Sequence, residues 1–312
     1  MTGRSTRIAA ISSALLDYDA TGRPLPGIAD PERREALAGQ LVESARRTDY
    51  VRTVLTRDLS ARRCDPSVAS FDPVLAAVVK TRAEDYEEAC WLVFLATHFG
   101  KTASGAWELC RAIYGRLGAG PIATWLATSV NVEELCTWIV ARADEIRSGP
   151  PRRKFGNHRK FESLTGNVDR GTPATIRTYV DWIHTAGSHR LLLNAAVGSA
   201  EGDPYRAFDQ LYHSMDVVSS FGRLAKFDYL SMLGKLELAP IKAGSTYLTT
   251  ATGPLKGAAL LFAPGDGPKP SPARMDDWLR ELGEHLDLTM QDLEDAICNW
   301  QKSPDVFVPF RG

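Results

Sequence analysis

The spacing of apolar residues is helical over most of the chain. Between residues 84 and 98, apolar side chains recur at intervals that place Tyr86, Cys90, Trp91, Phe94 and Leu95 on one broad face, wide enough to be core. A capping Asp and a Pro at the first helical position start another helix at residues 30–31. The same spacing predicts helices over residues 71–80, 104–114, 132–146, 173–186, 204–214, 221–236, 254–262, 274–285 and 290–300.

Alternating runs typical of strands are nearly missing, and residues 245–250 are the one candidate. The pattern therefore predicts an all-α fold. Clusters of Pro and Gly interrupt it at residues 148–151 and 264–270. From these breaks we expect two helical lobes behind an N-terminal arm: the arm covers residues 1–30, the first lobe residues 31–150, and the second lobe, with the candidate active-site motifs, residues 151–312.

The charge balance limits how the protein could bind nucleic acid. The 312 residues include 37 Lys and Arg against 38 Asp and Glu, for a net charge of −1. A chain this close to neutral has no general attraction to DNA or to an anionic membrane, so such a partner must be held by local patches.

Cysteine usage and missing motifs exclude several classes. The five cysteines are far apart in sequence and form no C-x-x-C pair, which favours a reducing cytoplasm; H-E-x-x-H is also absent, so we expect no metal and no cofactor. No apolar run reaches the roughly 18 residues of a membrane span, and Asp17 and Asp19 interrupt a start that faintly resembles a signal peptide. Hydrolase elbows, Walker A loops and dinucleotide fingerprints are missing. We expect a cytoplasmic protein without membrane contact.

The strongest charge anomaly lies at residues 147–160, which hold six basic residues and no acid. Lys and Arg neutralise phosphates and release counterions, so this segment is a candidate for contact with a nucleic-acid backbone. Asn157 and His158 add hydrogen-bonding groups. The alternative is a solvated linker. The basic residues are Arg147, Arg152, Arg153, Lys154, Arg159 and Lys160.

Two further segments combine glycine with polar residues near helix ends. His98 and Lys101 flank the helix stop Gly100, with Trp107 close behind; a His at this place is either a structural residue or a functional one. At residues 250–259, Thr252 can cap a helix, while Gly253 and Lys256 lie in its first turns. A capped helix packed closely on a neighbour explains that second segment as well as a ligand site does.

Residues 219–230 form a candidate anion site. Ser and Gly residues precede a helix, Gly222 stands at its start, and Arg223 and Lys226 lie three apart on one face. Asp228 follows between aromatic residues; it is either a carboxylate with a pKa raised by burial or the partner of a nearby cation.

Taken in order, His98-Phe99-Gly100-Lys101 with Trp107, residues 154–160, Phe221-Gly222-Arg223 with Asp228, and Thr252-Gly253-Pro254 with Gly257 resemble the alpha-glutamyl/putrescinyl-thymine pyrophosphorylase family, third clade. The ending at residues 293–302 resembles it too. The resemblance implies an all-helical fold related to helix-hairpin-helix DNA glycosylases and a partner that is double-stranded phage DNA with hypermodified pyrimidines.

Two chemistries follow from the resemblance. One is excision of the modified base by a DNA glycosylase acting in anti-phage defence, for which we expect Asp228 as the catalytic carboxylate and Asp209 or Asp216 as alternatives. The other is transfer, in which an amine displaces pyrophosphate from a 5-hydroxymethyl pyrimidine and Arg223, Lys226 and Lys256 meet the leaving group. Both need the nucleotide flipped out of the duplex.

Excision is slightly favoured because the chain has no recognisable amine-donor site, and a non-catalytic reader of modified DNA is the rival. Two features of the glycosylases are missing, namely the L-P-G-x-G hairpin and the four-cysteine loop of some relatives. The residues expected to contact DNA or substrate are His98, Lys101, Trp107, Arg152, Arg153, Lys154, Asn157, His158, Arg159, Lys160, Tyr212, Gly222, Arg223, Lys226, Thr252, Gly253 and Lys256.

Overall fold

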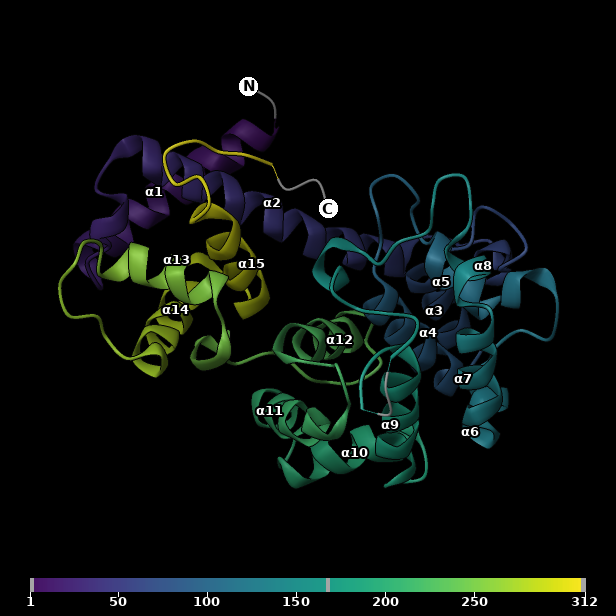
Figure 1. Ribbon diagram of the computed structural model, residues 1–312. Helices are drawn as coiled ribbons and strands as arrows, with labels where there is room; N and C mark the ends of the chain where they lie inside the picture. The colour runs from purple at the N-terminus through teal and green to yellow at the C-terminus, as the bar shows by residue number, and fades with distance from the viewer. Residues whose placement is uncertain (1–2, 167–168, 310–312) are drawn as a thin grey trace. The chain divides into compact units, whose positions relative to one another are not determined.

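The computed structural model describes residues 3–166 and 169–309, and over these residues the chain is helical without a β-strand. This confirms the all-α prediction (Figure 1). None of the described helices is both long and apolar enough to cross a bilayer. The α-helices are α1 (Gly3–Thr21), α2 (Pro31–Thr56), α3 (Pro73–Arg82), α4 (Tyr86–Phe99), α5 (Glu108–Tyr114), α6 (Trp125–Val130), α7 (Val132–Ala141), α8 (Ala143–Arg147), α9 (Thr172–His184), α10 (His189–Ser199), α11 (Pro204–Ser214), α12 (Arg223–Lys235), α13 (Gly253–Phe262), α14 (Pro272–Leu286) and α15 (Met290–Trp300).

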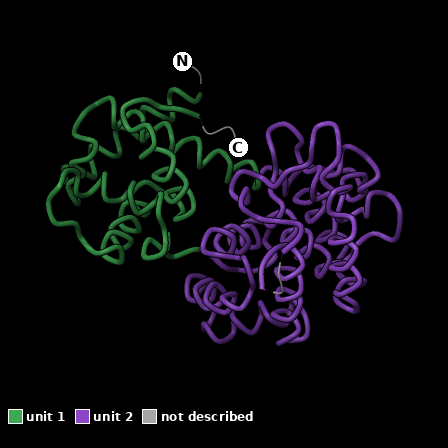
Figure 2. Tube along the Cα trace, viewed as in Figure 1, with its two compact units in different colours: residues 1–52, 243–311 green, residues 53–242, 312 purple. Residues whose placement is uncertain are grey.

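The chain divides into two compact units, each described here by itself (Figure 2). Unit 1 combines the N-terminal residues up to Arg52 with the described chain from Ala243 onward, whereas unit 2 is the continuous stretch Thr53–Lys242. The Pro and Gly cluster at residues 148–151 therefore lies inside unit 2, between α8 and α9. The cluster at residues 264–270 lies inside unit 1, between α13 and α14.

Unit 1 forms its core from helices at both ends of the sequence. Leu37 and Leu41 of α2 share a buried cluster with Leu279 of α14 and Leu293 of α15. Polar contacts join the same helices, because the Thr48 hydroxyl donates to Asp292 over 2.7 Å and the Ser44 hydroxyl to Asp295 over 2.8 Å. Unit 1 is thus closed by its C-terminal helices.

Unit 2 is built around α4, which is buried on every side from Glu88 to Ala96. A helix that is apolar all round belongs inside a core, and α4 contacts α3, α5, α6, α10 and α12. The apolar stripe predicted for residues 84–98 is therefore confirmed as core. At the end of α4, the chain turns into the loop that carries the first candidate site segment.

The structure departs from the expected elements in several places. The strand candidate at residues 245–250 is wrong, because Tyr247 takes a left-handed conformation and a 3-10 turn follows over Leu248–Thr250. The helix expected over residues 132–146 is split into α7 and α8 at Arg142, and α5 begins at Glu108 rather than at residue 104. Helices α1, α6 and α10 were not predicted.

Candidate functional site

Two Phe-Gly motifs far apart in sequence meet in unit 2. Gly100 ends α4 with a φ of +69°, a conformation that glycine adopts without strain. A Cβ placed on Gly156 would lie 2.8 Å from the Cα of Gly100, so the two backbones touch with no side chain between them. The Gly156 N–H also donates to the Phe99 carbonyl over 2.7 Å. The contact fixes the basic segment, residues 147–160, against the end of α4.

Arg159 follows from this anchor and is nearly buried, with a side chain only 8% exposed. Its Nε donates to the Thr97 carbonyl over 3.0 Å, and its Nη2 donates to the Asp228 carboxylate over 3.2 Å. His158 approaches the same carboxylate, with Nδ1 3.7 Å from Oδ2. The expected catalytic residue Asp228 is therefore held by two residues of the basic segment, and its side chain is 28% exposed.

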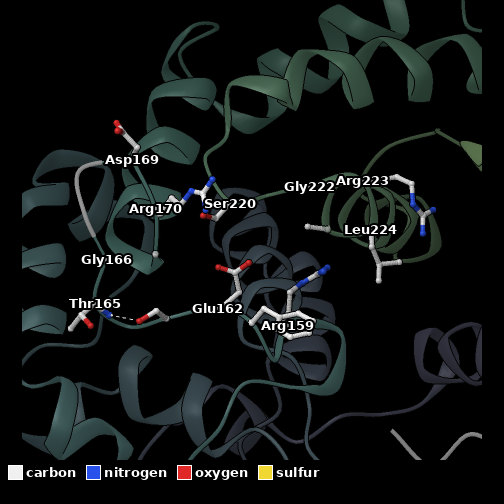
Figure 3. A pocket seen from close by; sticks show the side chains of 14 residues that line it. Arg159, Glu162, Thr165, Gly166, Asp169, Arg170, Ser220, Gly222, Arg223 and Leu224 are labelled. Atoms are coloured by element: carbon white, nitrogen blue, oxygen red, sulfur yellow. Dashed lines mark hydrogen bonds between the residues drawn. The ribbon is translucent and has the colours of Figure 1, made fainter. Parts of the chain in front are cut away.

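A cavity of about 690 Å³, called pocket 1 here, opens beside Arg159 (Figure 3). Its size suits a nucleotide-sized ligand. Residues from 159–166 and 169–171 form one wall, and Ser220 with the start of α12 forms the other. Asp228 is not among the residues that line it. Those residues are Arg159, Phe161, Glu162, Ser163, Thr165, Gly166, Asp169, Arg170, Gly171, Ser220, Gly222, Arg223, Leu224 and Ala225.

Glu162 is one of the lining residues that the sequence did not suggest. Burial raises the pKa of its carboxyl, while the charge of Arg159 acts in the opposite direction. A carboxyl with a raised pKa, in a pocket, is suited to proton transfer. The sequence signal was weak, because Glu162 lies just outside the basic segment and its burial depends on distant parts of the chain.

The start of α12 is open to pocket 1. Gly222 is the N-cap and supplies no side-chain hydrogen bond to the first turn, whose residues Arg223, Leu224 and Ala225 line the cavity. The N–H groups and the dipole at the start of a helix favour an anion at such a place. Lys226 takes another direction: it is buried, pairs with Asp216 and lies 4.1 Å from the centre of the Tyr212 ring.

The alternative carboxylates lie away from pocket 1. Asp209 on α11 is 3.5 Å from Nε2 of His213, and Asp216 pairs with Lys226. Neither lines pocket 1 or the second pocket described below. Tyr212, Lys226 and Asp216 form one contact group between α11 and α12, so the structure separates Lys226 from Arg223 despite their helical spacing.

His98 is buried under the site and uncharged. Its Nε2 is 3.0 Å from the Thr172 hydroxyl, which itself donates to the Ser163 carbonyl over 2.9 Å. Because a hydroxyl has one proton to donate, Nε2 of His98 is the donor in this pair. Burial, with a smaller contribution from the charge of Arg159, lowers the pKa of His98 to about 3. His98 therefore helps to hold Thr172 against Ser163.

The basic segment also lines a second, smaller cavity of about 270 Å³, called pocket 2 here. It has no acidic residue in its lining. Arg153 is used structurally, because its Nη1 donates to the carbonyls of Ile146 and Ser148 over 3.0 and 2.7 Å at the end of α8. The lining consists of Leu109, Arg147, Arg152, Arg153, Lys154, Phe155, Lys160 and Leu164.

Residues 159–164 separate the two cavities. Arg159, Phe161, Glu162 and Ser163 line pocket 1, whereas Lys160 and Leu164 line pocket 2. This one segment therefore contributes to both. Asn157 is exposed on the preceding 3-10 turn and lines neither cavity.

Lys101 and Trp107 interact with each other beyond the end of α4. The Lys101 ammonium lies 5.9 Å from the centre of the Trp107 ring, within the range of a cation–π contact. Neither residue lines pocket 1 or pocket 2.

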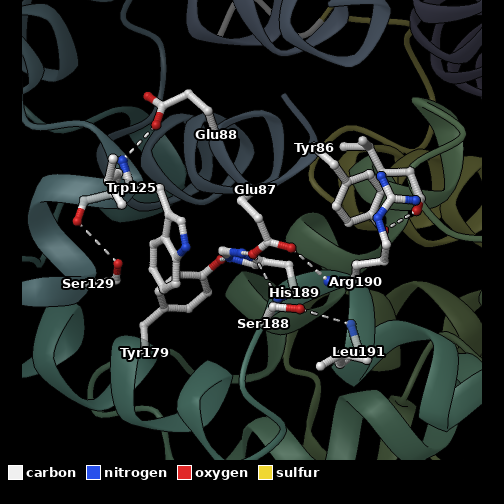
Figure 4. Close-up of polar contacts among 12 residues, drawn as sticks. Tyr86, Glu87, Glu88, Trp125, Ser129, Tyr179, Ser188, His189, Arg190 and Leu191 are labelled. Atoms are coloured by element: carbon white, nitrogen blue, oxygen red, sulfur yellow. Dashed lines mark hydrogen bonds and ion pairs between the residues drawn. The ribbon is translucent and has the colours of Figure 1, made fainter. Parts of the chain in front are cut away.

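A chain of hydrogen bonds reaches α12 from inside unit 2, and Figure 4 shows its part from Glu87 through His189 to Tyr179. Glu87 lies 2.6 Å from Nδ1 of His189, whose Nε2 is 2.7 Å from the Tyr179 hydroxyl, and this hydroxyl is 2.9 Å from that of Tyr229 on α12. Burial alone would raise the pKa of Glu87, but hydrogen bonds from His189 and Arg190 lower it to about 2. The chain joins α4, α9, α10 and α12.

The last candidate segment lies in unit 1. Thr252 makes no side-chain cap at the start of α13, so the capping expectation is wrong; its φ and ψ are helical, which is not the extended conformation of a capping Thr. Gly257 packs directly against the Ile297 carbonyl of α15, and a Cβ on Gly253 would lie 2.7 Å from the Cys298 sulfur. Thr252, Gly253 and Lys256 line neither pocket.

Among the described residues, no three His, Cys, Asp or Glu side chains gather closely enough to hold a metal ion. A family model matches most of the chain: residues 32–312 fit the model described as alpha-glutamyl/putrescinyl thymine pyrophosphorylase clade 3. That range includes every residue of both pockets. No curated protein and no solved structure matches the chain significantly, so the likeness to helix-hairpin-helix glycosylases stays a prediction.

Proposed function

We propose a function from one premise: the chain belongs to clade 3 of the alpha-glutamyl/putrescinyl thymine pyrophosphorylase family. The protein is an enzyme that acts on a modified pyrimidine in DNA. Its reaction replaces a diphosphate on the 5-hydroxymethyl group of that pyrimidine with an amine. Excision, which the sequence slightly favoured, becomes the second candidate.

The observation that carries the proposal is the cationic lining of pocket 1. Arg159, Arg170 and Arg223 line a cavity large enough for a nucleotide, and the uncapped first turn of α12 faces the same space. Guanidinium groups and the positive end of a helix dipole together suit a phosphate-bearing substituent. Glu162 and Asp169 are the acidic residues of the lining.

The proposed reaction is a nucleophilic substitution in which an amine displaces pyrophosphate. The amine nitrogen attacks the exocyclic carbon on C5, a C–N bond forms, and the C–O bond to the diphosphate breaks. Its electron pair leaves with pyrophosphate. The proton lost by the amine passes to the Glu162 carboxylate, and the arginines stabilise the charge that develops on the leaving group.

The basic segment gives the DNA backbone a place to bind. Pocket 2 has five cationic residues in its lining and no acidic one. Of these, Arg153 is committed to the end of α8, which leaves Arg147, Arg152, Lys154 and Lys160 to contact phosphates. Lys160 lines pocket 2, and the next residue, Phe161, lines pocket 1. A DNA backbone bound at pocket 2 would therefore lie next to pocket 1.

Excision is supported by the carboxylates. In that reaction, the C1′–N1 bond breaks and water adds to C1′, with a carboxylate stabilising the oxocarbenium-like centre. Asp228, which the sequence suggested for this role, pairs with Arg159 but does not itself line pocket 1. Glu162 lines the pocket and has a raised pKa, so it is the stronger candidate for this role.

The test uses the purified full chain and a duplex with one 5-hydroxymethyl pyrimidine carried as its diphosphate ester, with glutamate or putrescine as the amine. Transfer releases pyrophosphate and gives an aminated nucleoside by mass spectrometry after digestion. Excision instead gives free base and abasic sites. An unmodified duplex is the substrate control. If the modified DNA stays chemically unchanged but bound, the protein is a reader and the proposed function is wrong.

Substitutions test which carboxyl group takes part in the reaction. We expect Glu162→Gln to abolish product formation while DNA binding remains, and Asp228→Asn to reduce it less, because Asp228 acts through Arg159. Arg206→Gln is the matched control, since Arg206 is exposed on α11 and lines neither pocket. Full activity in Glu162→Gln contradicts the assignment of proton transfer.

A further inference from the structure

Phe161 is an aromatic side chain exposed to solvent at a ligand-sized cavity. Its side chain is 91% exposed, more than any other large hydrophobic residue described, and it lines pocket 1. Burial of a Phe side chain stabilises a fold, and this position forgoes that stabilisation. Single exposed apolar residues are common, so the inference rests on what surrounds the ring.

One cationic side chain lies near the Phe161 ring, and others line the same cavity. The Lys160 ammonium lies 5.1 Å from its centre, and Lys160 itself lines pocket 2. On the pocket 1 side, Arg170 and Arg223 line the same cavity as Phe161. An apolar ring with a cation near its face, at a cavity lined by three arginines as well as by Glu162 and Asp169, suits neither a lipid core nor an apolar protein surface. It suits a partner with flat aromatic groups between anionic phosphates, which is the chemistry of DNA.

The base of Phe161 is firmly held although its tip is exposed. Gly156 abuts the Gly100 backbone, and the buried Arg159 is tied to Thr97 and Asp228. After Phe161, the Glu162 N–H donates to the Arg159 carbonyl over 2.9 Å, and the Ser163 carbonyl accepts from the Thr172 N–H over 2.8 Å. A ring on a fixed base can enter a stack without much loss of backbone entropy.

We propose that Phe161 enters the base stack of duplex DNA at the place that the target nucleotide leaves when it moves into pocket 1. The ring then replaces the stacking that the flipped base has lost and keeps the gap open. This inference rests on the proposed function, because it takes pocket 1 as the site of the extruded nucleotide.

The test compares Phe161→Ala with wild type on two substrates of the same sequence, duplex and single-stranded. A single strand has no gap to fill, so only the duplex reaction should suffer. We expect kcat/KM on the duplex to fall about 5- to 150-fold, the range that corresponds to loss of one base–aromatic stack, with the single-stranded reaction unchanged. Phe161→Trp should restore the duplex reaction.

Tyr205→Ala is the matched control, because Tyr205 is an aromatic residue on α11 with 52% exposure and lines neither pocket. It should leave both reactions at the wild-type rate. An equal loss on both substrates in Phe161→Ala, or no loss on the duplex, overturns the proposal.

A second measurement needs no turnover and separates this inference from the proposed function. 2-Aminopurine is placed next to the modified base, where its fluorescence rises when stacking is disturbed. Wild type should raise this fluorescence on binding the duplex, because the neighbouring base has left the stack and Phe161 keeps the gap open. In Phe161→Ala the gap closes again, so the fluorescence should not rise at equal occupancy. If the fluorescence behaves so but no product forms, the proposed function fails and the inference stands. If product forms without the Phe161-dependent rise, the inference fails alone.

Discussion

Gly156→Ala tests the backbone contact on which the site is built. The new Cβ would lie 2.8 Å from the Cα of Gly100, 2.9 Å from its carbonyl carbon and 3.0 Å from the Lys101 nitrogen. All three are backbone atoms and cannot rotate away. Since carbon atoms pack at roughly 3.5–4.0 Å, one of the two segments must move by about 1 Å.

The energetic cost follows from what that movement disturbs. Overpacking by one methyl group costs about 1–3 kcal/mol. The same shift stretches the 2.7 Å hydrogen bond from the Gly156 N–H to Phe99 and the 3.0 Å bond from Arg159 to Thr97. From the overpacking and the weakened hydrogen bonds together, we expect Gly156→Ala to lower the free energy of unfolding by about 2–4 kcal/mol, or Tm by about 5–15 °C.

Differential scanning calorimetry on the full chain measures this change. Gly198→Ala is the control, because Gly198 lies within α10 and a Cβ there meets nothing within 4 Å. That substitution should stabilise the protein by about 0.5–1 kcal/mol, as Ala does in a helix. A wild-type Tm in Gly156→Ala refutes the contact.

The remaining predictions concern pH and salt. The pKa of His98 is lowered in the folded protein to about 3 from 6.5. As the pH falls, the unfolded chain therefore binds a proton on His98 before the folded protein does, which favours unfolding. The stability from this group is complete above pH 6.5 and falls as the pH drops towards 3, by about 2 kcal/mol between pH 8 and pH 5. His98→Gln should flatten this dependence in urea unfolding, and an unaltered slope against pH would contradict it. Arg152→Gln with Lys154→Gln should reduce the salt dependence of DNA binding, measured by fluorescence anisotropy, by a slope of about 1.8. Arg142→Gln with Arg206→Gln is the control, and equal slopes in the two double variants would mean that the basic segment is only a linker.

The helices were predictable where one face is strongly apolar. Residues 204–214 and 290–300 were expected as helices and match α11 and α15 at both ends. Helix α10 was missed because His189 and Leu193 are its only fully buried residues, which leaves no clear periodicity. For residues 245–250, the alternating pattern gave no sign of the turn at Tyr247, which Asp276 supports by accepting from Thr246 over 2.8 Å.

The candidate site was predictable as segments but not as an arrangement. The sequence identified both Phe-Gly motifs, yet nothing local indicates that Gly100 and Gly156 touch. Glu162 was missed because its burial depends on segments far along the chain. For Lys226, helical spacing gave the face of the residue but not its neighbour, which is Asp216.

The segment over residues 159–164 has no helix or strand of its own beyond Arg159, yet it supplies walls to both pockets. Its anchors, Gly156 and Arg159, precede the residues that face the ligands. Because residues of this one short segment line different pockets, a shift in the backbone of residues 160–164 would reshape pocket 1 and pocket 2 together.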